Sequence, residues 1–240
     1  MSLVGDTARW LIDGSHWTGP DGVLHRLAEH LTVSGIAVAL AAAVALPIAF
    51  WLGHVRRGGP LVVGLANASR AVPTFAVLVV LVATPVGFGN RATVLALVLF
   101  AVPPLLTNAY VGVRDVDDDA REAARGMGMS GLQLLRRVEV PLALPLVLAG
   151  VRTAAVQVVA TATLAAYVGG GGLGRLIADG FGRADAAMTA AGGVLVAALA
   201  LVVEVVLGGL QRRLTPGPRG HDRQPAVAVD ATTAPVGTGA

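Results

Sequence analysis

The residues of this sequence that can bind a solute lie in polar rows within apolar segments. Thr153, Gln157 and Thr161 recur every fourth residue, so a helix places their hydroxyl and amide groups on one face. Inside a membrane, such a row faces water or protein and not lipid. It forms either a wall of a translocation path or a set of hydrogen bonds between helices, and the sequence leaves both interpretations open.

A second polar row and two isolated charges have a similar character. Asn67 and Arg70 stand three residues apart, with Thr74 four positions further on, and are candidates for the path or for a contact with another subunit. Arg152 and Glu204 fall inside apolar segments. Because an isolated charge at the bilayer centre costs roughly 2.5–3.5 kcal/mol, we expect these two either to form an ion pair or to reach the interface separately.

Several other kinds of chemistry are excluded. The chain has no cysteine and no lysine, so it contains neither a thiolate site nor the lysine of a Walker A nucleotide-binding loop. Its histidines lack metal-ligand spacing, and we predict no metal site and no catalytic residue. Gly169, Gly171 and Gly174 match a dinucleotide-binding spacing, but they follow an apolar segment and not a strand. We expect a sharp turn or a re-entrant segment in the tract 169–174, whose role stays open.

The elements that must position these residues are membrane helices. Apolar residues make up 55% of the chain and charged residues 14%, whereas a soluble domain carries about 25% charged residues. The formal charge of +3 is spread between apolar runs, so no nucleic-acid partner is expected. We predict an all-α protein with about five transmembrane helices that contact lipid, near residues 31–53, 61–87, 92–113, 142–168 and 186–210.

The second of these spans is ambiguous. Its first part, residues 61–70, carries Asn67, Ser69 and Arg70 and precedes Pro73. It is either a polar helix at the interface before a shorter span, or part of one kinked helix with a polar face. For the whole chain we predict three regions: an extracytoplasmic segment 1–27 without a signal peptide, a transmembrane domain 28–210 and a disordered tail 211–240.

The charges also predict an orientation. Arginines are concentrated in the segments that five spans place on the side opposite the N-terminus. By the positive-inside rule, we expect the N-terminus outside the inner (plasma) membrane, with the loop 114–141 and the C-terminus in the cytoplasm.

This loop predicts a compact pair of helices. Three aspartates at 117–119 suit a helix N-terminus, and Gly128 ends a short helix that spans Ala120 to Met127. Ser130 can cap a second short helix through Arg137, and Pro141 limits where the next helix begins.

The loop resembles the EAA loop of ATP-binding-cassette (ABC) importer permeases. Glu122, Ala123 and Ala124 are followed at the family's spacing by Gly128 and by Val138-Glu139-Val140-Pro141. Valine replaces isoleucine and leucine in the last group. The resemblance implies the type I importer fold and a loop that docks in a cleft of an ATPase, with Glu122, Ala123, Ala124, Gly128 and Pro141 as coupling residues.

A narrower resemblance concerns the substrate. The stretches RAVPTFAVL (70–78) and GMGMSGLQLLRRVEVPLALPLVLAGVRTAAVQVVATATLAAYVGGGGLGRLI look similar to permeases for glycine betaine, carnitine or choline. This implies a second permease copy or homologue, a cytoplasmic ATPase dimer that carries ATP and Mg, and an extracytoplasmic binding protein, with no cofactor on this chain. The alternatives are a permease for another solute such as methionine, an ion-coupled secondary transporter, and a membrane enzyme.

Overall fold

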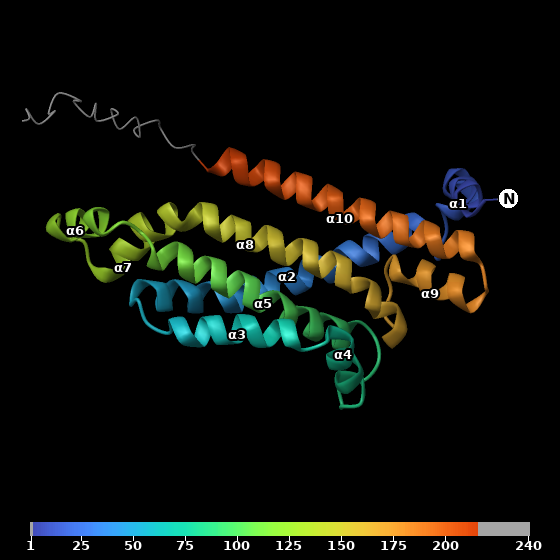
Figure 1. Cartoon of the computed structure of the whole chain (residues 1–240), viewed down its shortest axis with the longest axis horizontal. Helices are drawn as coiled ribbons and strands as arrows, with labels where there is room; N and C mark the ends of the chain where they lie inside the picture. Colours follow the sequence, from blue (N-terminus) through green and yellow to red (C-terminus); the bar gives the residue numbers. More distant parts are fainter. Residues whose placement is uncertain (1, 216–240) are drawn as a thin grey trace, which may run out of the picture.

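The computed structural model describes residues 2–215, without the side chains of Val63, Asn67, Ser69 and Arg70. Every regular element in this part of the chain is a helix. Long helices run side by side along one axis (Figure 1). By length and composition, four stretches can cross a membrane: α2 (Val23–His54), α5 (Asn90–Arg114), the stretch Gly131–Val168 that contains α8 (Val140–Thr161), and α10 (Ala186–Leu214).

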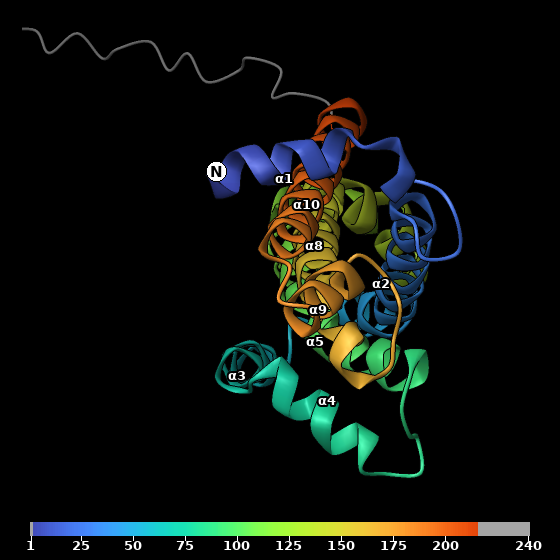
Figure 2. The same cartoon turned by 90° about the vertical axis from the view of Figure 1, so that its right-hand side faces the viewer.

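The remaining span is divided. Helix α3 (Gly59–Ala71) lies alongside α5, and α4 (Thr74–Val82) turns away across the axis of the bundle (Figures 1 and 2). The break falls at Val72 and Pro73, both in extended backbone conformation, because proline disfavours the helical conformation of the residue before it. Each piece is shorter than the ~20 residues of a full span. The segment 61–70, which contains Asn67, Ser69 and Arg70, thus belongs to a separate helix that runs along the bundle.

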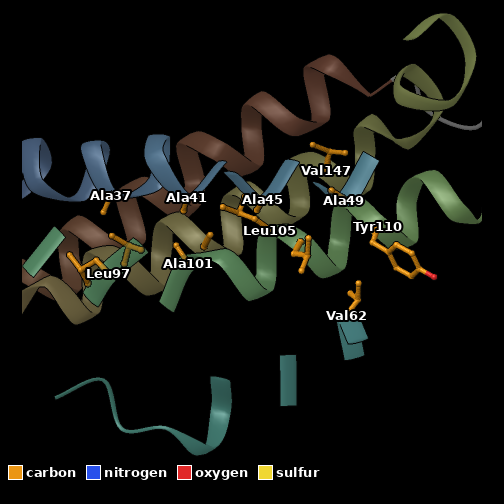
Figure 3. Close-up of a cluster of buried hydrophobic side chains, with 14 of the residues drawn as sticks. Ala37, Ala41, Ala45, Ala49, Val62, Leu97, Ala101, Leu105, Tyr110 and Val147 are labelled. Atoms are coloured by element: carbon orange, nitrogen blue, oxygen red, sulfur yellow. The ribbon is translucent and has the colours of Figure 1, made fainter. Parts of the chain in front are cut away.

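Small side chains bring the two central helices close together. Ala37, Ala41, Ala45 and Ala49 recur every fourth residue of α2, and all are fully buried. They face a row on α5 that includes Leu97, Ala101 and Leu105 (Figure 3). Without a hydrophobic driving force between helices in lipid, such rows favour association because they permit close packing.

The ends of the bundle carry short helices. Helices α1 (Leu3–Ile12) and α9 (Gly174–Gly182) lie at one end, near the short 3-10 turn Gly14–His16. Helices α6 (Asp118–Gly126) and α7 (Gly131–Leu134) lie at the other end (Figure 1). The N-terminus and the loop 114–141 are therefore on opposite ends of the molecule.

Two predicted boundaries are shifted. The first long helix begins at Val23, so part of the segment predicted as 1–27 belongs to it. Helix α10 continues to Leu214, and the side-chain amide of Gln211 donates to the carbonyl of Pro145 at 3.0 Å. Disorder from residue 211 is thus wrong for 211–214, because this contact extends the helix. Residues 216–240 lie outside the described part.

Candidate functional site

Local sequence rules build α6 at one end of the bundle. The Asp117 carboxylate caps the helix by accepting from the backbone N–H groups of Asp119 at 2.7 Å and Ala120 at 3.4 Å. Gly128 has a φ of +78°, a left-handed conformation that glycine adopts without strain and that ends the helix. These contacts set the bounds of α6 at Asp118–Gly126. The helix therefore begins two residues before the predicted start at Ala120 and ends one residue before the predicted end at Met127.

The two faces of α6 differ sharply. Glu122 and Ala123 are exposed, whereas Arg121 and Ala124 are buried, with 4% and 1% of their surface accessible. The EAA triplet is therefore split: its first two members face solvent, and the third packs against the protein. Gly128 is exposed at the turn beyond the helix.

The buried face of α6 is anchored by a network of three ionisable side chains. Arg121 Nη2 donates to the His54 carbonyl at 3.0 Å and lies 3.0 Å from Glu139 Oε1. His54 Nδ1 lies 2.6 Å from Glu139 Oε2. Glu139 is fully buried, so one carboxylate stands between α6, the end of α2 and the root of α8.

Spacing in the sequence does not distinguish these three residues. The available signal was Glu139, an acidic residue two positions before Pro141 at the start of an apolar segment. A buried acid needs a partner, but nothing local indicates that Arg121 and His54 supply it.

A second tie on the surface joins α6 to the segment after α2. Arg56 Nη2 lies 2.6 Å from Asp118 Oδ1 and donates to the carbonyl of Val116 at 3.1 Å. The hydrogen bond from Arg56 holds the pKa of Asp118 below its usual value. Both side chains are exposed, so this tie orients the loop more than it stabilises the fold.

The second helix of the loop is not separate from the fourth span. Ser130 caps α7 in a capping box, accepting from the Gln133 N–H at 3.4 Å while its own N–H donates to Gln133 Oε1 at 2.8 Å. The predicted end at Arg137 is wrong: the π-helical turn Leu135–Glu139 continues directly into α8. Because proline lacks an N–H and crowds the preceding turn, this wider turn admits Pro141 without a break.

Two of the three residues in the first polar row border a hollow. Thr153 and Gln157, both exposed, line a space of about 500 Å³ between α8, α5 and the break between α3 and α4. Thr161 lies outside this lining. Thr107 Oγ1 is buried there without a hydrogen-bond partner among the described residues. The remaining residues of the lining are Ala66, Val72, Pro73, Thr74, Phe100, Pro103, Pro104 and Asn108.

The other candidates fall into two groups. Asn67 and Arg70 lie on α3, but their side chains are outside the described part. Arg152 on α8 and Glu204 on α10 form an ion pair, with Arg152 Nε 3.5 Å from Glu204 Oε1, and both are partly exposed. The pair thus bridges two helices on the outside of the bundle.

The glycine tract is a tight connection at the end opposite α6. It joins the 3-10 segment Ala162–Val168 to α9, and Gly169 and Gly172 have positive φ angles. The Gly172 N–H donates to Glu29 Oε2 at 2.9 Å. The Leu173 N–H donates to Nδ1 of the buried His30 at 3.3 Å, and His30 Nε2 lies 2.8 Å from the carbonyl of Val159. The start of α2 therefore holds this turn in place.

Comparisons with known proteins agree on one family. The model of the family described as binding-protein-dependent transport system inner membrane component matches residues 35–219. The glycine betaine/carnitine/choline transport system permease protein OpuCB of Bacillus subtilis is 36% identical, over 81% of this chain and 89% of that protein.

Two further relatives and one solved structure complete the comparison. The carnitine transport permease protein OpuCB of Listeria monocytogenes is 40% identical, over 78% of this chain and 86% of that protein. The osmoprotectant import permease protein OsmW of Salmonella typhimurium is 32% identical, over 88% and 98%. A solved structure of the MetNI methionine ABC transporter in inward facing conformations matches with a TM-score of 0.70 and 21% identity, over 81% of this chain and 96% of that one. This likeness shows the type I permease fold.

Proposed function

This chain belongs to the family of binding-protein-dependent transport system inner membrane components, and we propose that it forms the translocation path of an ABC importer for small osmoprotectants. Glycine betaine, carnitine, choline and proline are the expected substrates. The relatives named for glycine betaine, carnitine and choline transport support this class. Transport is non-covalent, and the chain contributes no catalytic residue of its own.

One observation carries the proposal. Helix α6 presents Glu122 and Ala123 to solvent at one end of the bundle, while its other face is held against two long helices through Arg121. This geometry suits a helix whose exposed face binds another protein and whose buried face transmits the resulting displacement to the long helices. We propose that the exposed face docks on a cytoplasmic ATPase dimer, which binds ATP and Mg, and that Gly128 and Pro141 shape the loop around it.

The hollow beside Thr153 and Gln157 is the proposed path. Hydroxyl and amide groups can bind a polar solute by hydrogen bonds and release it readily. The position of Ala66 on its lining supports a contribution from α3, the helix that carries Asn67 and Arg70. A second copy of this chain or a homologue would close the other side of the path.

The proposed orientation follows from the charges and the ends of the bundle. The end with α6 lies in the cytoplasm, and the end with α1, α9 and the glycine tract lies outside, where a substrate-binding protein delivers the solute. ATP-driven closure of the ATPases moves the two α6 helices, and the path opens alternately to the two sides.

Uptake in transporter-deficient cells tests this proposal. Cells that express the chain together with its genomic neighbours are given labelled glycine betaine, with labelled methionine in parallel. ATP-dependent betaine uptake that disappears when only this chain is omitted is the expected result. Methionine uptake alone would keep the permease and overturn the substrate class. Uptake that follows an ion gradient and not ATP would contradict the importer mechanism itself.

A further inference from the structure

The buried network behind α6 points to residues that act between the ATPase surface and the path. Glu139 is fully buried, and its two oxygens face different helices: Oε1 lies 3.0 Å from Arg121 on α6, and Oε2 lies 2.6 Å from His54 on α2. Arg121 also donates to the backbone carbonyl of His54. Any displacement of α6 must therefore move Glu139 and His54 with it or break the contacts of a fully buried carboxylate.

The network is poorly suited to a role in stability alone. Arg121 Nη1 and Glu139 Oε1 are buried without a hydrogen-bond partner among the described residues, so the contact from Arg121 to Oε1 is Coulombic. Buried ion pairs rarely stabilise a protein more than apolar residues of the same size, and a partly satisfied network is less favourable still. A role in specifying geometry explains its presence better.

Glu139 is placed where its displacement can move the helix that lines the hollow. It is the last residue of the π-helical turn, after which the helix continues without interruption through α8. At 1.5 Å per residue, Thr153 on the hollow lies about 20 Å further along the same helix. A shift of Glu139 therefore moves the wall of the hollow, because a packed helix transmits displacement as a rigid body.

We propose that Arg121, Glu139 and His54 are positioning residues that couple motion of α6 to α8 and α2. This rests on the proposed function. When α6 moves with the ATPase, the contact between Arg121 and Glu139 displaces the start of α8 in the same direction. The contact between Glu139 and His54 displaces the end of α2 together with it. None of the three is expected to touch either ATP or the transported solute.

The test uses the complete transporter, reconstituted in proteoliposomes with its ATPase and binding protein. The measured quantity is the number of labelled glycine betaine molecules imported per ATP hydrolysed. Glu139→Gln preserves the shape of the side chain and removes its charge, and Arg121→Met removes the opposite charge. We expect both variants to hydrolyse ATP while the transport ratio falls at least about fivefold, the lower end of typical coupling between sites.

Matched controls separate coupling from general damage. Asp115→Asn makes the same acid-to-amide change at an exposed position between α5 and α6, and Arg136→Met makes the same arginine change at an exposed position of the π-helical turn. Both should keep the wild-type ratio. Arg121→Lys retains the positive charge and should recover most of the ratio lost in Arg121→Met.

Three results would overturn the proposal. The first is a wild-type ratio in Glu139→Gln and Arg121→Met. The second is a parallel fall of uptake, ATP hydrolysis and assembled complex with no change in the ratio, which a merely structural role predicts. The third is an Arg121→Lys variant as uncoupled as Arg121→Met. Failure of the proposed function looks different, because the wild-type complex itself would then import no betaine.

Discussion

Gly53 on α2 and Val113 on α5 lie so close together that a Cβ atom added to Gly53 would stand 2.8 Å from the Cβ of Val113. This contact ends the row of buried alanines along α2. It fixes the distance between the two central helices just before His54, the residue through which α2 contacts α6. The close packing of α2 against α5 at Gly53 thus also determines where His54 lies relative to Glu139 and Arg121.

Gly53→Ala should destabilise the protein. The new methyl group overlaps Val113 and the backbone of Tyr110, and overpacking of this kind costs about 1–3 kcal/mol. Gly35→Ala, in the same helix but with open space around it, should leave stability unchanged or raise it by up to about 1 kcal/mol. Thermal unfolding of both variants in detergent measures the difference, and equal melting temperatures would contradict it.

The split EAA triplet predicts that neighbouring alanines respond differently to one substitution. Ala124→Leu places a larger side chain at a buried position and should lower the free energy of unfolding by about 1–3 kcal/mol. Ala123→Leu, on the exposed face, should leave unfolding unchanged and weaken binding of the ATPase. Detergent melting and co-purification of the ATPase test the two effects. If Ala124→Leu unfolds at the wild-type temperature, the buried face of α6 has space for a larger side chain, and this prediction is wrong.

The hollow predicts a difference within the polar row of α8. Gln157→Ala removes a group on the lining, and loss of one hydrogen bond to the solute is worth about 0.5–1.5 kcal/mol, or roughly two- to tenfold in apparent affinity. Thr161→Ala, which lies outside the lining, should leave uptake unchanged. Initial rates of betaine uptake at several concentrations measure this difference. If Thr161→Ala is the more impaired variant, the hollow is not the path.

The ion pair between α8 and α10 predicts non-additive mutations. Arg152→Ala and Glu204→Ala each leave one charge without its partner, so the double variant should be more stable than the sum of the single effects implies. The interaction energy for contacting residues is about 0.5–3 kcal/mol. A double-mutant cycle on unfolding in lipid-containing detergent measures it. Strict additivity would mean that each charge is satisfied independently.

Local patterns predicted much of the loop 114–141 correctly. The ends of α6 follow from Asp117 and Gly128, and the start of α7 follows from Ser130. These signals act within a few residues, so they can be read directly along the chain. The end of the second helix could not be read in this way, because Pro141 disfavours a helix locally, whereas the π-helical turn and the packing of α8 admit it.

By itself, the sequence determined that the protein is helical and apolar enough for a membrane, that a capped helix and a glycine follow Asp117, and that the loop has the spacing of importer permeases. Only the tertiary structure decided that His54, Arg121 and Glu139 meet, and that Thr153 and Gln157 share a hollow while Thr161 does not. The physical reason is the distance along the chain between the residues that interact. Hydropathy and capping depend on adjacent residues, but a contact between positions 54 and 139 depends on how closely α2, α5 and α8 pack, which small residues distributed over all three helices decide together.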